Sequence, residues 1–292
     1  MSNEKPLTLI TGASGKTGSR VAAQLQKKGY PVRLAGRKRS SSGDFSGNHV
    51  YFDWYDPATY GPALKGVNQI YLVVPQMDIH PEKVMVPFIQ EAIWSGVKRF
   101  VLLGSASVDE EGPVFGKVHR ALKKLAPEWA VLRPSYFMEN FTEGPHRQTI
   151  AQFRKIYSAT GEGRIGFVSA DNIATVAFHA LTDAVPHNTE HIITGPESLS
   201  YAEVAQKASE ILNQPIQHEP LSEETLRNQM IQAGMPEDYA IMLAGLDTHI
   251  REEGREDQVT DTVLRITGNH PRSIVCLFSK QMRIRTSVKH TR

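Results

Sequence analysis

Short apolar runs alternate with amphipathic stretches through the first half of the chain. The runs are rich in Val, Ile, Leu and aromatic residues and are bounded by turn residues, as strands buried on both faces of a sheet are. They are Leu7–Thr11, Val32–Ala35, Val50–Phe52, Ile70–Val74, Phe100–Leu103 and Trp129–Leu132. The alternation predicts an α/β protein with a doubly wound parallel sheet, right-handed crossovers and helices on both faces.

Two of the intervening stretches carry an apolar stripe at helical spacing. The stripe after the first strand consists of Val21, Ala22 and Leu25. The stripe before the fifth strand consists of Val84, Phe88, Ile89, Ala92 and Ile93. Both stripes predict helices that bury one face against the sheet.

The second half of the chain has fewer strand signals and more helical ones. Apolar runs remain at Gly166–Val168 and His191–Thr194. Helices are expected to start at Asn172, Tyr201, Glu223 and Glu237. This pattern predicts a small, mostly helical region at the carboxyl edge of the sheet, where open α/β sheets bind ligands.

A glycine-rich loop, Thr11–Gly18, follows the first strand and opens the first helix. Its three glycines allow a tight turn, a close approach to a pyrophosphate and close packing of helix on strand, and the helix N-terminus offers free N–H groups to the phosphates. Its place between a strand and a helix, inside a unit of about 30 residues, favours a Rossmann dinucleotide site. The expected contacts are Gly12, Ser14, Gly15, Lys16 and Thr17. A nucleoside-triphosphate loop is excluded because Ile10 stands where that motif requires glycine.

The end of the second strand favours NADPH over NADH. An NAD site usually places Asp or Glu there to bind the ribose hydroxyls, but this chain has no acid before Asp44. Arg37 and Lys38 suit a 2′-phosphate, and Arg37 can also stack on adenine. Asp53 and Trp54 end the third strand, where we expect the adenine edge to lie.

The chain lacks the proton donor of a typical short-chain dehydrogenase. Such an enzyme pairs a Tyr with a Lys four residues later, which lowers the pKa of the phenol, and none of the nine tyrosines has Lys at that spacing. The corresponding segment offers Lys117 and His119 but no phenol. Ser105 ends the fifth strand, where the serine of such enzymes often stands.

Two interpretations of the missing donor are open. Either the chain binds NADPH without chemistry, or its reaction needs no such donor. An iminium ion is already positive at the acceptor, so hydride addition gives a neutral amine directly. A site for that reaction needs a positioned nicotinamide, an apolar pocket, and aromatic faces or a carboxylate to stabilise the cation.

Composition narrows the class of protein further. The 292 residues include 33 Lys and Arg against 31 Asp and Glu, a balance that argues against a nucleic-acid or membrane partner. Cys276 is the only cysteine, which excludes an intrachain disulfide and favours a cytoplasmic location. His187 and His191 have the spacing of a metal-binding pair, but Pro186 and the following strand place them in a loop, so we expect no metal.

The glycine loop, Arg133–Asn140 and Ser169–Ala174 together resemble the NmrA-like branch of atypical short-chain dehydrogenases. Other segments are similar to fungal ergot-alkaloid reductases of the festuclavine synthase and agroclavine dehydrogenase type. These are Phe52–Trp54, Ile156–Gly161, Gly195–Glu197 and Leu199–Tyr201. The resemblance implies a Rossmann core that holds NADPH, and reduction of an indole-alkaloid iminium in secondary metabolism without the Tyr–Lys pair.

The resemblance also implies a set of site residues. By position, Pro134 and Phe137 lie beside the nicotinamide, and Val74 and Pro75 wall the cofactor cleft. The expected substrate contacts are Tyr136, Met138, Glu139, Asn140 and Tyr157. Lys117 and Tyr136 are the candidate catalytic residues.

The same resemblance implies how the chain is divided into regions. Residues 1–150 are expected to form the NADP-binding core, 151–279 a substrate-binding region with strands that return to the core, and 280–292 a basic tail. The expected partner is a small alkaloid-like molecule. A sheet edge or a helix face could form a homodimer, but nothing in the pattern compels one.

Three alternative functions stay open. One is an NADP-dependent cyclase or isomerase of an alkaloid pathway that does not reduce its substrate. Another is a redox sensor that binds NADP without turnover, although the chain shows no large basic or apolar stripe for a partner. The third is a carbonyl or quinone reductase.

Overall fold

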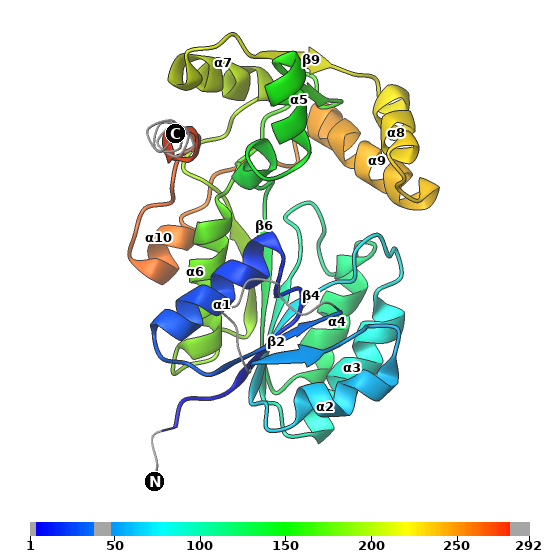
Figure 1. Ribbon diagram of the computed structural model, residues 1–292, viewed down its shortest axis with the longest axis vertical. Helices are drawn as coiled ribbons and strands as arrows, with labels where there is room; N and C mark the ends of the chain where they lie inside the picture. Colours follow the sequence, from blue (N-terminus) through cyan, green and yellow to red (C-terminus); the bar gives the residue numbers. More distant parts are fainter. Residues whose placement is uncertain (1–3, 38–47, 281–292) are drawn as a thin grey trace, which may run out of the picture. The chain divides into compact units, whose positions relative to one another are not determined.

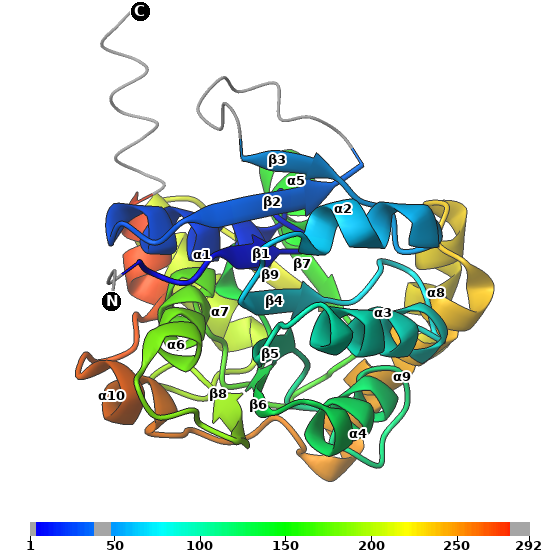
Figure 2. The same ribbon diagram turned by 90° about the horizontal axis from the view of Figure 1, so that it is seen from below.

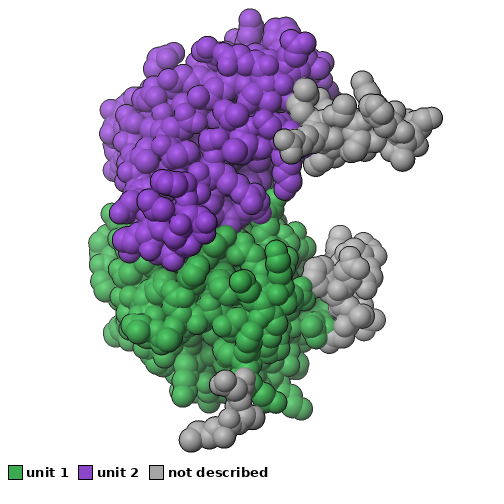
Figure 3. Space-filling model, turned by 90° about the vertical axis from the view of Figure 1, so that its left-hand side faces the viewer, with its two compact units in different colours: residues 1–134, 173–192 green, residues 135–172, 193–292 purple. Residues whose placement is uncertain are grey.

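The computed structural model describes residues 4–37 and 48–280. The chain divides into two compact units, coloured separately in Figure 3. The first comprises residues 1–134 and 173–192, and the second comprises residues 135–172 and 193–292. The predicted boundary at residue 150 falls within the second unit, in helix α5 (Pro145–Phe153). The predicted basic tail lies, apart from Lys280, outside the described residues.

A seven-stranded sheet forms the centre of the first unit (Figure 1). Its order is β3-β2-β1-β4-β5-β6-β8, and the pairings from β3 through β6 are all parallel. The strands are β1 (Thr8–Ile10), β2 (Val32–Gly36), β3 (His49–Tyr51), β4 (Gln69–Val73), β5 (Arg99–Leu103), β6 (Glu128–Pro134) and β8 (Thr189–Ile193). With β1 between β2 and β4, the order is that of a doubly wound Rossmann sheet. The predicted fold class is therefore confirmed.

Helices cover both faces of this sheet, as Figure 2 shows. One face carries α1 (Lys16–Lys27) and α6 (Ala170–Thr182). The other carries α2 (Tyr60–Leu64), α3 (Glu82–Trp94) and α4 (Phe115–Leu125), with the short 3-10 helix η2 (Pro57–Thr59) before α2. The predicted stripes of α1 and α3 are largely buried, with Val21, Leu25, Phe88 and Ile89 fully inside. Burial of these stripes is what holds the layers together.

The second unit contains a two-stranded parallel sheet and several helices. The sheet pairs β7 (Lys155–Ser158) with β9 (Gln217–Pro220). The helices are η3 (Met138–Phe141), α5, α7 (Tyr201–Leu212), α8 (Glu223–Gln232), α9 (Glu237–Glu253) and α10 (Thr262–Thr267). The predicted starts at Tyr201, Glu223 and Glu237 are confirmed. At the first of them, the Ser200 hydroxyl accepts from the Glu203 N–H while the Glu203 carboxylate accepts from the Ser200 N–H, which forms a capping box.

The strand predicted at Gly166–Val168 is wrong. This segment makes one isolated bridge, between Val168 and Phe137, and the preceding Ile165 makes another with Leu199. A Cβ at Gly166 would collide with the carbonyl oxygen of Gln258 and approach the Thr194 side chain. The segment is therefore buried by neighbouring backbone and loops rather than by a strand ladder, and its apolar run reflects that burial.

None of the helices in the described ranges combines the length and the apolar character that crossing a lipid bilayer requires.

We expect Gly18→Ala to lower the free energy of unfolding by about 1–3 kcal/mol, because the added Cβ would collide with the Gly12 carbonyl. Gly245→Ala is the matched control. Gly245 lies inside α9 with no atom near its Cβ position, so alanine there should stabilise the protein by about 0.5–1 kcal/mol. Chemical denaturation of both variants measures the difference. Equal effects would show that the close approach at Gly18 is not required.

Candidate functional site

The glycine loop of the first unit is shaped by two close backbone approaches. Gly12 has φ of 60°, and a Cβ at this position would lie 3.0 Å from Val73 Cβ. A Cβ at Gly18 would collide with the Gly12 carbonyl oxygen. The Gly15 N–H donates to that same oxygen over 2.9 Å. Only glycine fits these positions without strain, so the loop lies directly on the end of β1.

The N-terminus of α1 is open to an anion. Gly15 is the N-cap residue, no described side chain caps this end, and the first turn carries no acid. Ser14 and Gly15 are exposed, whereas Thr17 and Gly18 are buried. Free N–H groups at a helix N-terminus are the ordinary binding site for a pyrophosphate. The loop therefore fits a dinucleotide, with the predicted contacts at its open side.

The end of β2 presents Arg37, which is exposed. Lys38, its predicted companion, lies outside the described residues. Arg37 is close enough to Tyr55 for its charge to act on the pKa of that phenol, which burial raises to about 12. The Tyr55 hydroxyl donates to Asp78 Oδ2 over 2.8 Å. The loops after β3 and β4 are thus joined next to the cation that we expect at the 2′-phosphate.

The two residues predicted at the adenine edge have defined local contacts. Asp53 Oδ1 accepts from the Tyr55 N–H over 3.1 Å, which shapes the turn after β3. The Trp54 ring packs edge-on against Phe52 and Phe88 at centroid distances of 4.8 and 5.1 Å. Trp54 therefore helps to anchor this turn to the core. Adenine contacts of both residues stay a prediction.

Arg133 fixes the loop after β5. Its guanidinium is buried and donates to the carbonyl oxygens of Ser105 and Ala106 over 3.3 and 2.9 Å. It also pairs with Glu190 Oε2 at 2.9 Å. The Ala106 N–H in turn donates to the carbonyl of Pro134. These bonds hold Ser105 and Pro134 at the carboxyl end of the sheet, where Val74 and Pro75 also follow β4.

Lys117 lies on α4 and its side chain is 42% exposed. Its Nζ is 3.1 Å from Glu82 Oε1 on α3, so the ammonium links two surface helices. Nearby His119 is buried against Trp129, and burial lowers its pKa. Among the described residues, neither side chain is hydrogen-bonded to a hydroxyl that it could position for proton transfer. The catalytic role of Lys117 stays a prediction. The ion pair with Glu82 alone explains why a cation stands at this position.

Tyr136 of the second unit is bonded to a buried acid. Its hydroxyl forms a side-chain hydrogen bond with Asp247 of α9. Burial, and then the charge of Asp247, raises the pKa of Tyr136 well above 10. A short-chain dehydrogenase needs the opposite effect, a phenol whose pKa is lowered. The arrangement therefore does not activate Tyr136 as an acid.

Asp247 is 7% exposed. Its Oδ2 accepts from the Ala159 N–H over 2.9 Å. Burial raises the pKa of Asp247 from 3.8 to about 6, although the two hydrogen bonds and Arg251 oppose the shift. At neutral pH the group is thus a buried, mostly ionised carboxylate.

Aromatic rings surround this part of the second unit. Tyr201 packs against Phe141 and Phe167 at 5.8 and 5.3 Å and stacks on His218 at 5.6 Å. Burial lowers the pKa of His146 to about 4, so its ring is neutral at pH 7. The rings packed around Tyr201 are therefore apolar or, in the case of His146, uncharged at pH 7.

The other predicted substrate contacts lie in the second unit and differ in how deeply they are buried. Met138 is 1% exposed and belongs to the core. Glu139 is buried, and its two carboxylate oxygens accept from the Ser169 hydroxyl and the Ala170 N–H, which caps the start of α6. Asn140 and Tyr157 are partly exposed. Phe137 bridges Val168. No observation tests their substrate or cofactor contacts, which stay predictions.

The sequence reading did not identify Asp247. The signal was present, because the buried face of α9 consists of Ala240, Ala244, Asp247 and Ile250. An acid inside an apolar stripe at helical spacing is a buried polar group that must have a reason. Glu256, which is fully buried and accepts from the Ser135 hydroxyl over 2.6 Å, was missed because it lies in a loop without periodicity.

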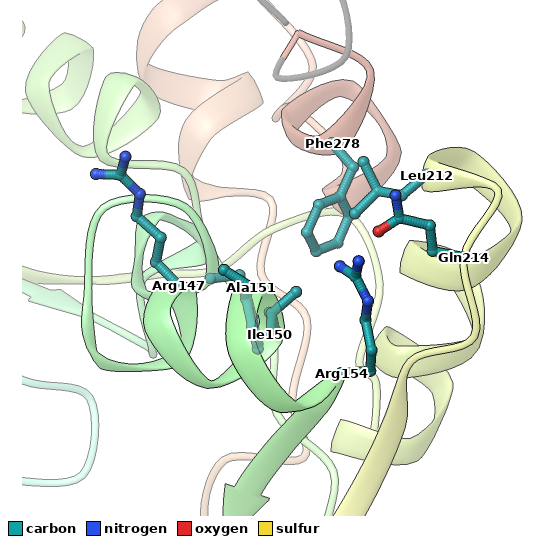
Figure 4. A pocket seen from close by; sticks show the side chains of 8 residues that line it. Arg147, Ile150, Ala151, Arg154, Leu212, Gln214 and Phe278 are labelled. Atoms are coloured by element: carbon teal, nitrogen blue, oxygen red, sulfur yellow. The ribbon is translucent and has the colours of Figure 1, made fainter.

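A small cavity of about 120 Å³ lies elsewhere in the second unit (Figure 4). The guanidinium of Arg154 lies beside Gln214 and Phe278, while Arg147 points away from them. None of the predicted site residues lines it. Ligand pockets usually exceed about 300 Å³, so this cavity is too small for an indole alkaloid.

His187 and His191, which have the spacing of a metal-binding pair, are hydrogen-bonded to each other. His187 Nδ1 lies 2.8 Å from His191 Nε2, and His187 Nε2 lies 3.2 Å from Asp183. Across residues 4–37 and 48–280, no cluster of three or more His, Cys, Asp or Glu is arranged to hold a metal ion.

The fold and the glycine loop define a doubly wound α/β protein of the dinucleotide-binding class. The chain belongs to the NmrA-like family, whose model matches residues 4–267. It is 46% identical over 274 residues to the uncharacterized oxidoreductase YesF of Bacillus subtilis, with 94% of each chain covered. It is 38% identical to festuclavine synthase I of Penicillium roqueforti, covering 90% of this chain and 94% of that one.

A solved structure has the same fold at low sequence identity. The triphenylmethane reductase of Citrobacter sp. in complex with NADP(H) aligns with a TM-score of 0.77 at 22% identity, over 94% of this chain and 99% of that one. The family resemblance deduced from the motifs is confirmed.

We expect the stability of the protein to depend on pH through Asp247. The pKa of about 6 in the folded state exceeds the ordinary 3.8, so the stability gained by the protonated carboxyl is complete at low pH and is lost as pH rises through 6. Relative to Asp247→Asn, the wild type should lose about 2 kcal/mol of unfolding free energy between pH 4 and pH 7. Denaturation of both proteins across this range measures the difference, and parallel curves would contradict it.

Proposed function

We propose that this protein is an NADPH-dependent reductase that transfers a hydride to the iminium carbon of an indole-alkaloid-type intermediate. The observation that carries the proposal is the state of Tyr136. Its hydroxyl is bonded to Asp247, and its pKa is raised rather than lowered. Ketone reduction requires a proton for the developing alkoxide, whereas iminium reduction requires none. A site with a buried carboxylate and no activated acid suits the second reaction.

The comparisons support the same class of reaction. The relatives include festuclavine synthases and agroclavine dehydrogenases at 35–39% identity. YesF, which is more similar, is named an oxidoreductase. A neighbour of the same fold is a reductase complexed with NADP(H). These names support a nicotinamide-dependent reductase, and the iminium substrate is our proposal.

The residues of the first unit would bind and orient the cofactor. The open N-terminus of α1 and the loop at Gly12–Thr17 would hold the pyrophosphate. Arg37 would pair with the 2′-phosphate, because a guanidinium binds phosphate with two hydrogen bonds. Arg133 holds the Ser105 loop through two bonds to its carbonyl oxygens, and its third bond is to Glu190 of β8. Bound NADPH supplies the hydride.

The residues of the second unit would stabilise the positive charge of the substrate. The faces of Tyr136 and neighbouring rings attract a cation through their quadrupoles. The buried rings also limit water around the reacting atoms. Hydride transfer converts the iminium into a neutral amine, so the attraction to these rings would weaken at that step.

The proposal is tested by NADPH oxidation at 340 nm with purified protein and a panel of cyclic indole iminium ions. Matched ketones and quinones are the controls. We expect turnover with iminium ions and little or none with the neutral acceptors. Turnover only with quinones would assign the protein to a different reductase class. Tight NADPH binding without any turnover would contradict a reductase and favour a sensor or a non-redox cyclase.

We expect Arg37→Ala to raise the Kd for NADPH by about 10- to 100-fold, which corresponds to loss of a charge-assisted hydrogen bond. The Kd for NADH should rise far less, because that cofactor has no 2′-phosphate and loses only stacking on adenine. Fluorescence titration measures both. Lys27→Ala, which removes an exposed cation from the last turn of α1, is the control for net charge. Equal losses for both cofactors would refute the 2′-phosphate assignment.

A further inference from the structure

We propose that Asp247 is the specificity-determining residue that makes this protein select a positively charged substrate, by serving as the anion opposite the substrate's cationic nitrogen. The inference rests on the proposed function and deepens it, since it names the group that recognises the charge. It is carried by the burial of Asp247 and by the set of partners that the carboxylate has.

The carboxylate of Asp247 has hydrogen-bond donors but no ion pair. Its hydrogen-bond partners are the Ala159 N–H and the Tyr136 hydroxyl. Among the described residues, no Lys, Arg or His nitrogen lies within 4.0 Å of it. Buried charges are normally paired because an isolated charge in an apolar environment is costly. Asp247 is therefore a buried anion that lacks its cation.

Arg251, the nearest cation on the same helix, binds other groups. Arg251 lies one turn after Asp247 on α9, and its charge acts on the carboxylate from a distance. Its guanidinium donates to the Ala159 carbonyl over 2.9 Å and pairs with Glu252 at 3.0 Å. Arg251 thus binds the carbonyl of Ala159, the residue whose N–H donates to Asp247. This clamp positions the carboxylate without neutralising it.

The surroundings favour a cationic organic group over a metal or a water-solvated ion. A carboxylate has about four acceptor positions, and two donors leave capacity for a third. Tyr136 and Tyr201 are both close enough for the charge of Asp247 to raise the pKa of their phenols. Two aromatic rings beside one carboxylate are the ordinary recognition chemistry for an alkylated ammonium or iminium.

A second buried acid shows what distinguishes Asp247. Glu256 is 0% exposed and accepts from the Ser135 hydroxyl. Asp247 keeps 7% of its surface exposed, and its neighbour Tyr136 is partly exposed. A ligand against Tyr136 can therefore reach Asp247, whereas Glu256 is enclosed by the protein.

The test uses two probes of equal shape and different charge, and it needs no turnover. N,N,N-Trimethyltryptammonium carries a permanent positive charge, and 3-(3,3-dimethylbutyl)indole replaces the nitrogen with carbon. Binding to the full chain with NADPH present is measured by calorimetry at pH 8. We expect the wild type to prefer the cation, and Asp247→Asn to weaken cation binding at least about tenfold, as loss of a buried charge pair does. Binding of the neutral probe should change less than about twofold.

Two further variants separate charge from structure. Glu253→Gln removes an exposed acid from the same helix and should leave both affinities unchanged. Tyr136→Phe keeps the ring but removes the hydroxyl bonded to Asp247, and the preference for the cation should persist. If Tyr136→Phe abolishes the preference as fully as Asp247→Asn does, Asp247 only positions Tyr136 and the inference is wrong. Wild-type protein that binds both probes equally, or neither, also overturns it.

The outcome is distinguishable from failure of the proposed function. A wild-type preference for the cation that depends on Asp247, without iminium reduction at 340 nm, would refute the reductase and leave the cation site standing. Iminium reduction with an unchanged charge preference in Asp247→Asn would do the reverse.

Discussion

The architecture of the first unit depends on the contact between the backbone of Gly12 and the start of α1. Because Gly18 has no Cβ, α1 can lie against the Gly12 carbonyl at the end of β1. The helix axis is then directed at the carboxyl edge of the sheet, and its first N–H groups are left without a capping side chain. Any larger residue would tilt the helix away and remove the anion site with it. The same contact therefore determines both how α1 packs and whether its N-terminus can bind an anion.

The second unit contains a buried acid, Asp247, on the apolar face of α9. It retains an acid at a position of a helix face that is otherwise apolar, at a cost in folding stability. Groups with strongly shifted pKa values cluster at functional sites in proteins. The bond to Asp247 also removes Tyr136 from the role that the phenol has in most short-chain dehydrogenases. The raised pKa of Tyr136 and the buried position of Asp247 are therefore linked, because each group acts on the other.

The sheet, its helices and the glycine loop could be predicted because their signals are local. Strand runs, helical stripes and the spacing of three glycines all lie within short windows. The buried acid could not be assigned a role because its partners, Tyr136 and Ala159, lie far away in the chain. Glu139 illustrates the same limit. Its position suggested a substrate contact, but only the tertiary structure shows that its carboxylate caps α6.

The division of the chain into units has a consequence for protein engineering. The chain passes from one unit to the other after Pro134, within α6 at Asn172 and at the end of β8 after Ile192. A single crossover with a relative at residue 135 would therefore also exchange most of α6 and β8, which belong to the sheet unit. A chimera that transplants only the second unit needs two separate inserts, 135–172 and 193 onward. Its junctions must preserve the helical phase of α6 and the strand register of β8.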